Sequence, residues 1–197
     1  MKEYKDFYFR KARAENYPAR SVYKLKEIDA RFKLLKSGMK ALDLGAAPGS
    51  WTLALAEKAG KHGIVVACDL KTTDTAFPPC VYFVQSDIYN PCPEFAALLQ
   101  SHAPFDMVAS DMAPATTGSV FTDQARSYDL ALASYETACK YLRQGGNFVT
   151  KIFMSQDVQD LQKQMRQSFQ TVKAFKPKSS RPESKETFLI GLSFLNK

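Results

Sequence analysis

Short apolar runs alternate with longer stretches of helical periodicity along this chain. The short runs are bounded by turn-forming residues, which is typical of strands. They predict strands over residues 40–44, 63–68, 81–84, 105–110, 147–152, 171–175 and 187–194. Apolar positions three and four residues apart predict helices over roughly residues 19–32, 50–59, 93–102, 123–143 and 155–168.

The order of these elements indicates the fold class. Val, Ile, Leu and Ala dominate the early strands, as expected when helices cover both faces of a parallel sheet. The connection 176–184 is short, contains Pro and Ser, and leaves no room for a helix, so the last two strands are expected to be antiparallel neighbours. The chain is therefore predicted to be an α/β protein with a doubly wound sheet.

Composition narrows the class of protein further. A chain of 197 residues with 45% hydrophobic and 24% charged residues suits one globular domain. No apolar run is long enough to span a membrane, and residues 1–13 lack the apolar core of a secretory signal. The four cysteines form no CxxC pair and only two histidines are present, so we expect no metal site and a reduced, cytoplasmic protein.

Charge is distributed unevenly along the chain. Residues 1–40 hold 12 Lys and Arg against 5 Asp and Glu, residues 41–162 hold 7 against 13, and residues 163–197 hold 8 against 2. We interpret residues 1–197 as a single domain with a basic helical segment at 1–35. If the two basic ends meet in space, they form a surface that attracts phosphates. The alternative is two solvated faces.

A glycine turn follows the first predicted strand. Residues 41–51 read Ala-Leu-Asp-Leu-Gly-Ala-Ala-Pro-Gly-Ser-Trp and lead directly into a helix. Gly45 and Gly49 allow a tight turn and a close approach of the backbone to a ligand. The spacing is not GxGxxG, so an NAD-dependent oxidoreductase fits poorly.

Acidic residues lie at the ends of three successive strands. Asp43 lies at the end of the first strand, where it could accept hydrogen bonds from loop amides or an ammonium group. Asp69 ends the second strand, where an acid commonly binds the ribose hydroxyls of a nucleoside ligand, and Asp87 follows the third, near an expected adenine. Each could instead cap a helix, but together with the glycine turn they favour a cofactor site.

Further charged residues lie near the ends of later strands. Asp111 ends the fourth strand, and Lys151 lies within the apolar run of the fifth, where an unpaired lysine is costly to bury. Lys24 lies on a helix with an apolar stripe, and Glu186 opens the last strand. Taken singly, each could be an ordinary surface charge.

Several segments together resemble the FtsJ family of S-adenosylmethionine-dependent RNA ribose 2′-O-methyltransferases. They are ArgSerValTyrLysLeu (20–25), LeuAspLeuGlyAlaAlaProGlySerTrp (42–51), CysAspLeu (68–70), SerAspMetAlaPro (110–114), ValThrLysIlePhe (149–153) and SerArgProGluSerLysGlu (180–186). The resemblance extends almost end to end. It implies a Rossmann-like class I methyltransferase fold, with a mostly parallel seven-stranded sheet, an antiparallel last strand, and helices on both faces.

The resemblance also implies roles for particular residues. The family's catalytic tetrad falls on Lys24, Asp111, Lys151 and Glu186. The family's positions for S-adenosyl-L-methionine fall on Gly49, Trp51, Asp69, Asp87 and Asp111, and the predicted cofactor site also includes Asp43, Gly45 and Pro48. The chain departs from the family at Ser50, where many members carry a second glycine, and in a short extension before the first helix.

The implied reaction methylates a ribose 2′-oxygen, which must lose its proton. We expect Lys151 to act as the general base, as the family implies. An ordinary lysine is protonated at neutral pH, so this role needs burial and a second cation such as Lys24 to favour loss of the proton. In the competing interpretation Lys151 stays charged and stabilises the developing alkoxide.

The basic ends predict the surface that binds RNA. Its expected phosphate contacts are Arg10, Lys11, Arg20, Lys26, Lys178 and Arg181. Tyr4, Tyr8 and Tyr17 could stack on bases, or could pack under the first helix.

The compact size favours the branch of the family that methylates a uridine ribose in large-subunit (23S-type) ribosomal RNA. Methylation of a transfer RNA anticodon loop and a non-catalytic role in ribosome assembly remain alternatives. We expect a monomer whose partner is RNA, with no membrane and no metal.

Overall fold

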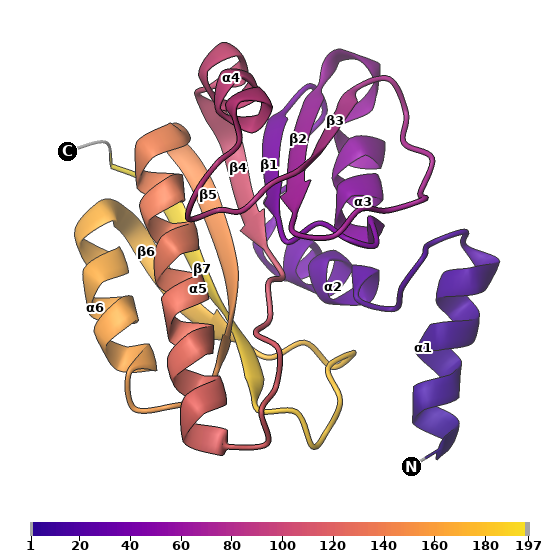
Figure 1. The fold of residues 1–197 in the computed structure, drawn as a ribbon, viewed down its shortest axis with the longest axis vertical. Coiled ribbons are helices and arrows are strands. Elements are labelled where there is room, and N and C mark those ends of the chain that lie inside the picture. The colour runs from indigo at the N-terminus through magenta and orange to yellow at the C-terminus, as the bar shows by residue number, and fades with distance from the viewer. Residues whose placement is uncertain (1, 196–197) are drawn as a thin grey trace.

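The computed structural model describes residues 2–195, with side chains from Phe7 onward. The described residues form one seven-stranded sheet with helices around it (Figure 1). The strands are β1 (Lys40–Leu44), β2 (Ile64–Asp69), β3 (Val81–Gln85), β4 (Phe105–Ser110), β5 (Leu142–Phe153), β6 (Phe169–Phe175) and β7 (Glu186–Phe194). The helices are α1 (Lys2–Ala14), α2 (Val22–Phe32), α3 (Ser50–Ala59), the short 3₁₀ turn η1 (Gly60–His62), α4 (Pro93–His102), α5 (Val120–Tyr141) and α6 (Val158–Ser168).

The strand order is β3-β2-β1-β4-β5-β7-β6. The pairs among β1 to β5 are parallel, whereas β7 runs antiparallel to both of its neighbours, β5 and β6. From β1 the strands are added outward to β3, and the chain then returns to place β4 on the other side of β1. Such a switch point opens a ligand crevice at the carboxyl ends of the strands. The prediction of a mostly parallel sheet with an antiparallel last strand is confirmed.

Alternate side chains of the strands fill two separate cores. Leu42 and Leu44 of β1 face a core shared with α4, α5 and α6. Ala41 of the same strand faces a second core shared with α2 and α3. This alternation follows from the two-residue period of a strand, and it explains why the central strands are apolar throughout.

Most predicted boundaries differ from the structure by three residues or fewer, and two elements differ more. Strand β5 begins at Leu142 rather than at residue 147, because Leu142 pairs with Phe105 of β4. The register of the two strands shifts after this pair, and the polar stretch 143–146 interrupts the apolar pattern from which the strand was predicted. Helix α1 was not among the helices derived from apolar spacing. Of its described side chains only Ala12 is buried, so the helix carries no apolar stripe to detect. It lies to the side of the sheet (Figure 1).

Candidate active site

Sheet register brings Asp111 and Lys151 together. Ser110, the last residue of β4, pairs with Thr150 of β5 in parallel register. Asp111, which directly follows β4, therefore lies beside Lys151, the next residue of β5. Lys151 Nζ donates to Asp111 Oδ1 over 2.8 Å and also to the Asp111 carbonyl oxygen.

Strand β7 adds Glu186 to this pair. Glu186 lies opposite Phe153 of β5 in the antiparallel ladder. Lys151 and Phe153 are two residues apart and so point to the same face, which places Glu186 on the face of Lys151. The antiparallel strand β7 thus places an acid at the carboxyl ends of the parallel strands.

Helix α2 supplies Lys24 from its first turn. Val22, Leu25 and Ile28 of this helix are fully buried against the sheet, which directs Lys24 toward the strand ends. Its Nζ lies 2.7 Å from Glu186 Oε1 and 4.0 Å from Asp111 Oδ1. The four predicted tetrad residues therefore converge in the structure.

The cluster balances two cations with two anions. The side chains of Lys24, Asp111, Lys151 and Glu186 are 14%, 14%, 7% and 11% exposed, respectively. Charges this buried are tolerated when each has a partner of opposite sign. Burial by itself raises the pKa of Glu186, but attraction and a hydrogen bond from the Lys24 ammonium outweigh it, and the pKa lies below its ordinary value. Glu186 thus stays ionised and holds Lys24.

The glycine turn after β1 forms one wall of a cavity beside the cluster. Gly45 has a φ of +79°, and a Cβ there would lie 2.3 Å from Met112 Cγ, so no larger residue fits. Gly45 and Ala46 donate to the Cys68 carbonyl oxygen, which joins the turn to the end of β2. We call the space over this turn the strand-end cavity. Its volume is about 640 Å³, within the range of small-molecule sites.

The lining of the strand-end cavity fits a nucleoside cofactor. Gly45, Asp69 and Asp111, all predicted cofactor residues, line it. Asp69 Oδ2 accepts from Ala47 N and Oδ1 from Lys71 N, and each oxygen keeps a second lone pair for a ligand hydroxyl. The tight turn and the acid at the end of β2 together match the chemistry expected at this position of a doubly wound sheet.

Several further lining residues were missed from the sequence, among them Tyr89, Arg126 and Asp129. Tyr89 lies two residues beyond Asp87, in a strand-end loop that the sequence argument already used. Arg126 and Asp129 come from α5, where their three-residue spacing places them on one face of the helix. Nothing in the local sequence distinguishes these two from other charges on a helix.

The other predicted cofactor residues lie around the cavity rather than on its lining. Pro48 accepts hydrogen bonds from Thr73 and Thr75 through its carbonyl oxygen, and Gly49, at a φ of +110°, precedes α3. Trp51 is buried, and its indole N–H donates to the Ser21 carbonyl oxygen 2.9 Å away. Asp87 is partly exposed and accepts from Tyr89 N. Their roles toward a cofactor stay predictions.

Asp43 is fully buried beneath the turn. One carboxylate oxygen accepts from Thr52 Oγ1 at 2.6 Å, and the other has no partner. Burial, reinforced by the charges of Asp111 and Asp69, raises the pKa of Asp43 to about 7 despite the Thr52 hydrogen bond. Its partner is a side-chain hydroxyl rather than the loop amides or ammonium group that we expected.

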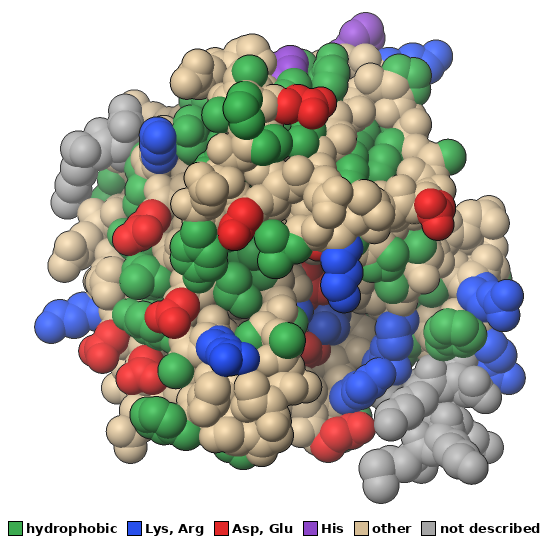
Figure 2. All heavy atoms as spheres, viewed as in Figure 1, with side chains coloured by type: hydrophobic (Ala, Val, Ile, Leu, Met, Phe, Trp, Pro, Cys, Tyr) green, Lys and Arg blue, Asp and Glu red, His purple; other side chains and the backbone are tan. Residues whose placement is uncertain are grey.

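The two basic ends of the chain meet in space. Lys11, Lys26 and Lys178 line a groove between α1, α2 and the end of β6, which we call the basic groove. Arg20 and Arg181 line a second pocket next to Lys24 and Glu186, which we call the arginine pocket. Arg10 belongs to neither lining. Figure 2 shows basic side chains gathered on the right, around a hollow with charged groups at its floor.

The tyrosines near the N-terminus pack within the protein. Tyr17 is 5% exposed, and its hydroxyl donates to Glu57. Tyr8 packs against the ring of Tyr23, with 5.3 Å between centroids. Packing under the first helices therefore accounts for Tyr17 and fits Tyr8 better than free stacking platforms. The side chain of Tyr4 lies outside the described side chains.

Similarity to solved structures identifies the class of protein to which the fold belongs. A ribosomal RNA methyltransferase from Plasmodium falciparum matches with a TM-score of 0.80 and 27% identity, over 92% of this chain and all of that one. The MycE methyltransferase of mycinamycin biosynthesis, in complex with Mg, SAH and mycinamycin VI, matches with a TM-score of 0.57 and 14% identity over 90% of this chain and 47% of that one, which concerns the fold alone. The architecture is that of a Rossmann-like methyltransferase.

The chain belongs to the FtsJ-like methyltransferase family, whose model matches residues 17–194. Relatives named Ribosomal RNA large subunit methyltransferase E confirm this. The relative from Nitratidesulfovibrio vulgaris (strain DP4) is 60% identical over 98% of this chain and 95% of its own. That from Lawsonia intracellularis is 53% identical over 98% and 97%. The resemblance inferred from the motifs is therefore confirmed.

Proposed function

We propose that this protein transfers a methyl group from S-adenosyl-L-methionine to the 2′-hydroxyl of a uridine ribose in large-subunit (23S-type) ribosomal RNA. One observation carries the proposal: Lys24, Asp111, Lys151 and Glu186 converge at the junction of two cavities. Asp111 lines the strand-end cavity, whereas Lys24 and Glu186 line the arginine pocket. A donor on one side and a ribose on the other would meet at this cluster.

The strand-end cavity is the proposed site of the methyl donor. When bound, S-adenosyl-L-methionine supplies a methyl group on a positively charged sulfur. Gly45 gives the backbone close approach, Asp69 would accept hydrogen bonds from ribose hydroxyls, and Asp111 would contribute negative charge near the sulfonium. Asp43, Pro48, Gly49, Trp51 and Asp87 complete the proposed site from positions around the cavity.

Lys151 is the proposed general base. Two of the three hydrogen-bonding directions of its Nζ point to the Asp111 carboxylate and carbonyl oxygens. The third direction is left for the ribose hydroxyl. A neutral lysine presents a lone pair there and takes the proton, whereas a charged lysine presents an N–H that stabilises the alkoxide. Asp111 orients the nitrogen in either case, and Glu186 holds Lys24 beside it.

RNA is the proposed partner, and the protein would act as a cytoplasmic monomer without a metal. Lys11, Lys26 and Lys178 would contact phosphates along the basic groove, with Arg10 on the outer face of α1. No helix within the described residues is both long and apolar enough to cross a membrane. The names of the relatives support ribosomal RNA over transfer RNA as the substrate.

Mapping of 2′-O-methyl groups tests the proposal. Ribosomal and transfer RNA from cells with and without this protein are compared by mass spectrometry. We expect one large-subunit uridine to lose its methyl group, and wild-type protein or Lys163→Ala, an exposed lysine of α6, to restore it. Lys151→Ala should fail, since general base catalysis contributes roughly 10²–10⁴-fold.

Other outcomes of the mapping would redirect the proposal. Loss of methylation at a transfer RNA anticodon position identifies the alternative substrate, and unchanged methylation everywhere identifies a non-catalytic assembly factor. Activity that falls as the pH drops through neutrality supports Lys151 as a base. Substantial activity of Lys151→Arg supports a charged stabiliser instead, because arginine keeps its proton.

A further inference from the structure

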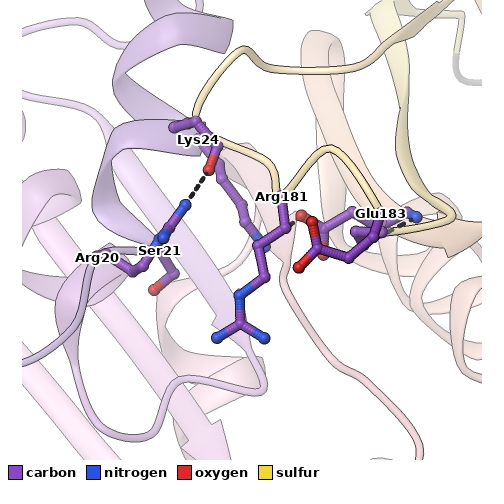
Figure 3. Close-up of a pocket in the computed structure, with 8 residues that line it drawn as sticks. Arg20, Ser21, Lys24, Arg181 and Glu183 are labelled. Carbon is purple, nitrogen blue, oxygen red and sulfur yellow. Dashed lines mark hydrogen bonds and ion pairs between the residues drawn. The ribbon is translucent and has the colours of Figure 1, made fainter. Parts of the chain in front are cut away.

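The arginine pocket lies between the start of α2 and the loop that leads into β7. Its volume is about 350 Å³. Arg20 and Ser21 enter from the α2 side, and Ser179 and Arg181 from the loop. Figure 3 shows the Arg20 and Arg181 side chains reaching into the same space from these two segments. Lys24 and Glu186 close the end nearest the catalytic cluster.

Two donors in this pocket are buried without an acceptor. Arg20 Nη2 donates to the Ser179 carbonyl oxygen at 2.6 Å, and the guanidinium lies 5.5 Å from the centre of the Tyr8 ring, but Nη1 is buried and has no hydrogen-bond partner. The hydroxyl of Ser179, a residue only 1% exposed, is also without a partner. Buried donors are costly to leave unsatisfied, so their presence side by side points to an acceptor group supplied by a ligand.

The charge of the pocket favours an anion. The Arg181 guanidinium makes no ion pair with any described residue. Of the two acids on the lining, Glu186 is neutralised by Lys24 at 2.7 Å, and Glu183 lies on the loop beyond Arg181. Guanidinium groups and a hydroxyl around one space form the donor set that binds phosphate oxygens.

The loop that carries Ser179 is held in place independently of any ligand. Glu27 of α2 accepts a hydrogen bond from Lys178 N at 2.6 Å and from Ser179 N at 2.9 Å. One carboxylate thus fixes two consecutive peptide groups. The pocket is therefore formed by two anchored segments rather than by mobile surface side chains.

We propose that the arginine pocket binds the phosphodiester group directly attached to the ribose that is methylated. This inference rests on the proposed function and specifies how its substrate is held. Lys24 and Glu186 belong both to the pocket and to the catalytic cluster, so a phosphate bound by Arg20 lies within one nucleotide of the reacting oxygen. Held there, the phosphate orients the sugar and carries no sequence information.

Equilibrium binding tests the pocket without relying on activity. The probe is a fragment of large-subunit RNA that contains the mapped nucleotide. One of the two linkages beside that nucleotide is a neutral methylphosphonate, and the adjacent riboses are 2′-deoxy so that no hydroxyl attacks it. The reference is the 2′-deoxy fragment with both linkages charged. At one of the two positions, we expect the neutral linkage to weaken binding by wild-type protein about tenfold or more. The same substitution should leave binding by Arg20→Ala nearly unchanged.

Further variants distinguish loss of the phosphate contact in the arginine pocket from a general loss of positive charge. Ser179→Ala and Arg181→Ala should also weaken binding, and Arg20→Ala should lower the salt dependence by about one phosphate contact. Arg166→Ala removes an equal charge from the last turn of α6 and should bind as wild type. With native RNA, Arg20→Ala should raise KM more than it lowers kcat.

Opposite results overturn the inference. An equal penalty for the neutral linkage in wild type and in Arg20→Ala, or no penalty at either linkage, excludes a phosphate in this pocket. Because binding is measured separately, wild-type protein that binds this probe in the expected way but does not methylate the unmodified fragment with S-adenosyl-L-methionine contradicts the proposed function and not the phosphate site. Melting temperatures of all variants identify any that fail to fold.

Discussion

At the scale of single residues, the burial of a carboxyl group links chemistry to stability. Asp43 has one oxygen bonded to Thr52 and one without a partner, at a position with no exposure to water. Its pKa of about 7 means that it changes charge near neutral pH. The unfolded chain, in contrast, releases this proton near pH 4.

Replacing Asp43 with Asn tests this link. Between about pH 4 and pH 7 the folded protein retains a proton that the unfolded chain has lost, so the free energy of unfolding should decrease as pH rises. The shift of about three units corresponds to at most roughly 4 kcal/mol. Urea unfolding between pH 5 and pH 8 should show a smaller decrease for Asp43→Asn than for wild type. Parallel curves would contradict the buried, titrating carboxyl.

At the scale of elements, α2 and the loop before β7 form one unit. The Glu27 carboxylate joins them through two backbone amides, and Arg20 adds a third hydrogen bond to the same loop. The loop ends at Glu186, so its position determines where that acid meets Lys24. The anchoring of the loop and the geometry of the proposed catalytic cluster are therefore coupled.

Glu27→Gln should weaken this unit, because an amide keeps one acceptor oxygen and replaces the other with a donor. We expect a loss of about 2 kcal/mol, or roughly 4–8 °C in Tm for a chain of this size, and a lower kcat. Calorimetry and steady-state kinetics measure both effects. Glu94→Gln, an exposed acid in the first turn of α4, serves as the matched control. A stable variant with unchanged kcat would show that the anchor is dispensable.

Much of this arrangement could be predicted from the sequence. The periodicity of apolar residues predicts the strands and helices, and therefore which residues lie at the carboxyl ends of the strands. The apolar residues around Lys151 indicate that its charge needs a partner. Contacts between a loop and a distant helix leave no such pattern. Glu27 reads as an ordinary surface acid. Ser50 departs from the family glycine, yet its hydroxyl forms two hydrogen bonds with the backbone of Ala19.

At the scale of the whole molecule, most basic side chains of the site lie on one side of the catalytic cluster that we propose, and acids outnumber cations on the other. The basic ends of the chain meet at the basic groove and the arginine pocket, whereas the lining of the strand-end cavity has three acids, Asp69, Asp111 and Asp129, against two cations, Lys71 and Arg126. Such a division suits a protein that binds a polyanion on one side and a cationic donor on the other. The two cavities adjoin where Asp111 of the strand-end cavity lies 4.0 Å from Lys24 of the arginine pocket.

Thermal unfolding should separate a methyl donor from a dinucleotide. A ligand that binds only the folded state, at 100 times its Kd, stabilises by about 2.7 kcal/mol, or roughly 5–10 °C for a chain of this length. S-adenosyl-L-methionine and S-adenosylhomocysteine should produce this increase in Tm, and NAD should not. Equal stabilisation by NAD would contradict the assignment of the strand-end cavity.

The late position of β7 in the chain has a consequence for biosynthesis. This strand inserts between β5 and β6 and brings Glu186 as its first residue. A polypeptide that stops before residue 186 lacks both the partner of Lys24 and the strand that connects β6 to the sheet. Truncated chains would therefore be incompletely folded and would lack one acid of the proposed catalytic cluster, so we expect activity to appear only after synthesis of the chain has passed β7.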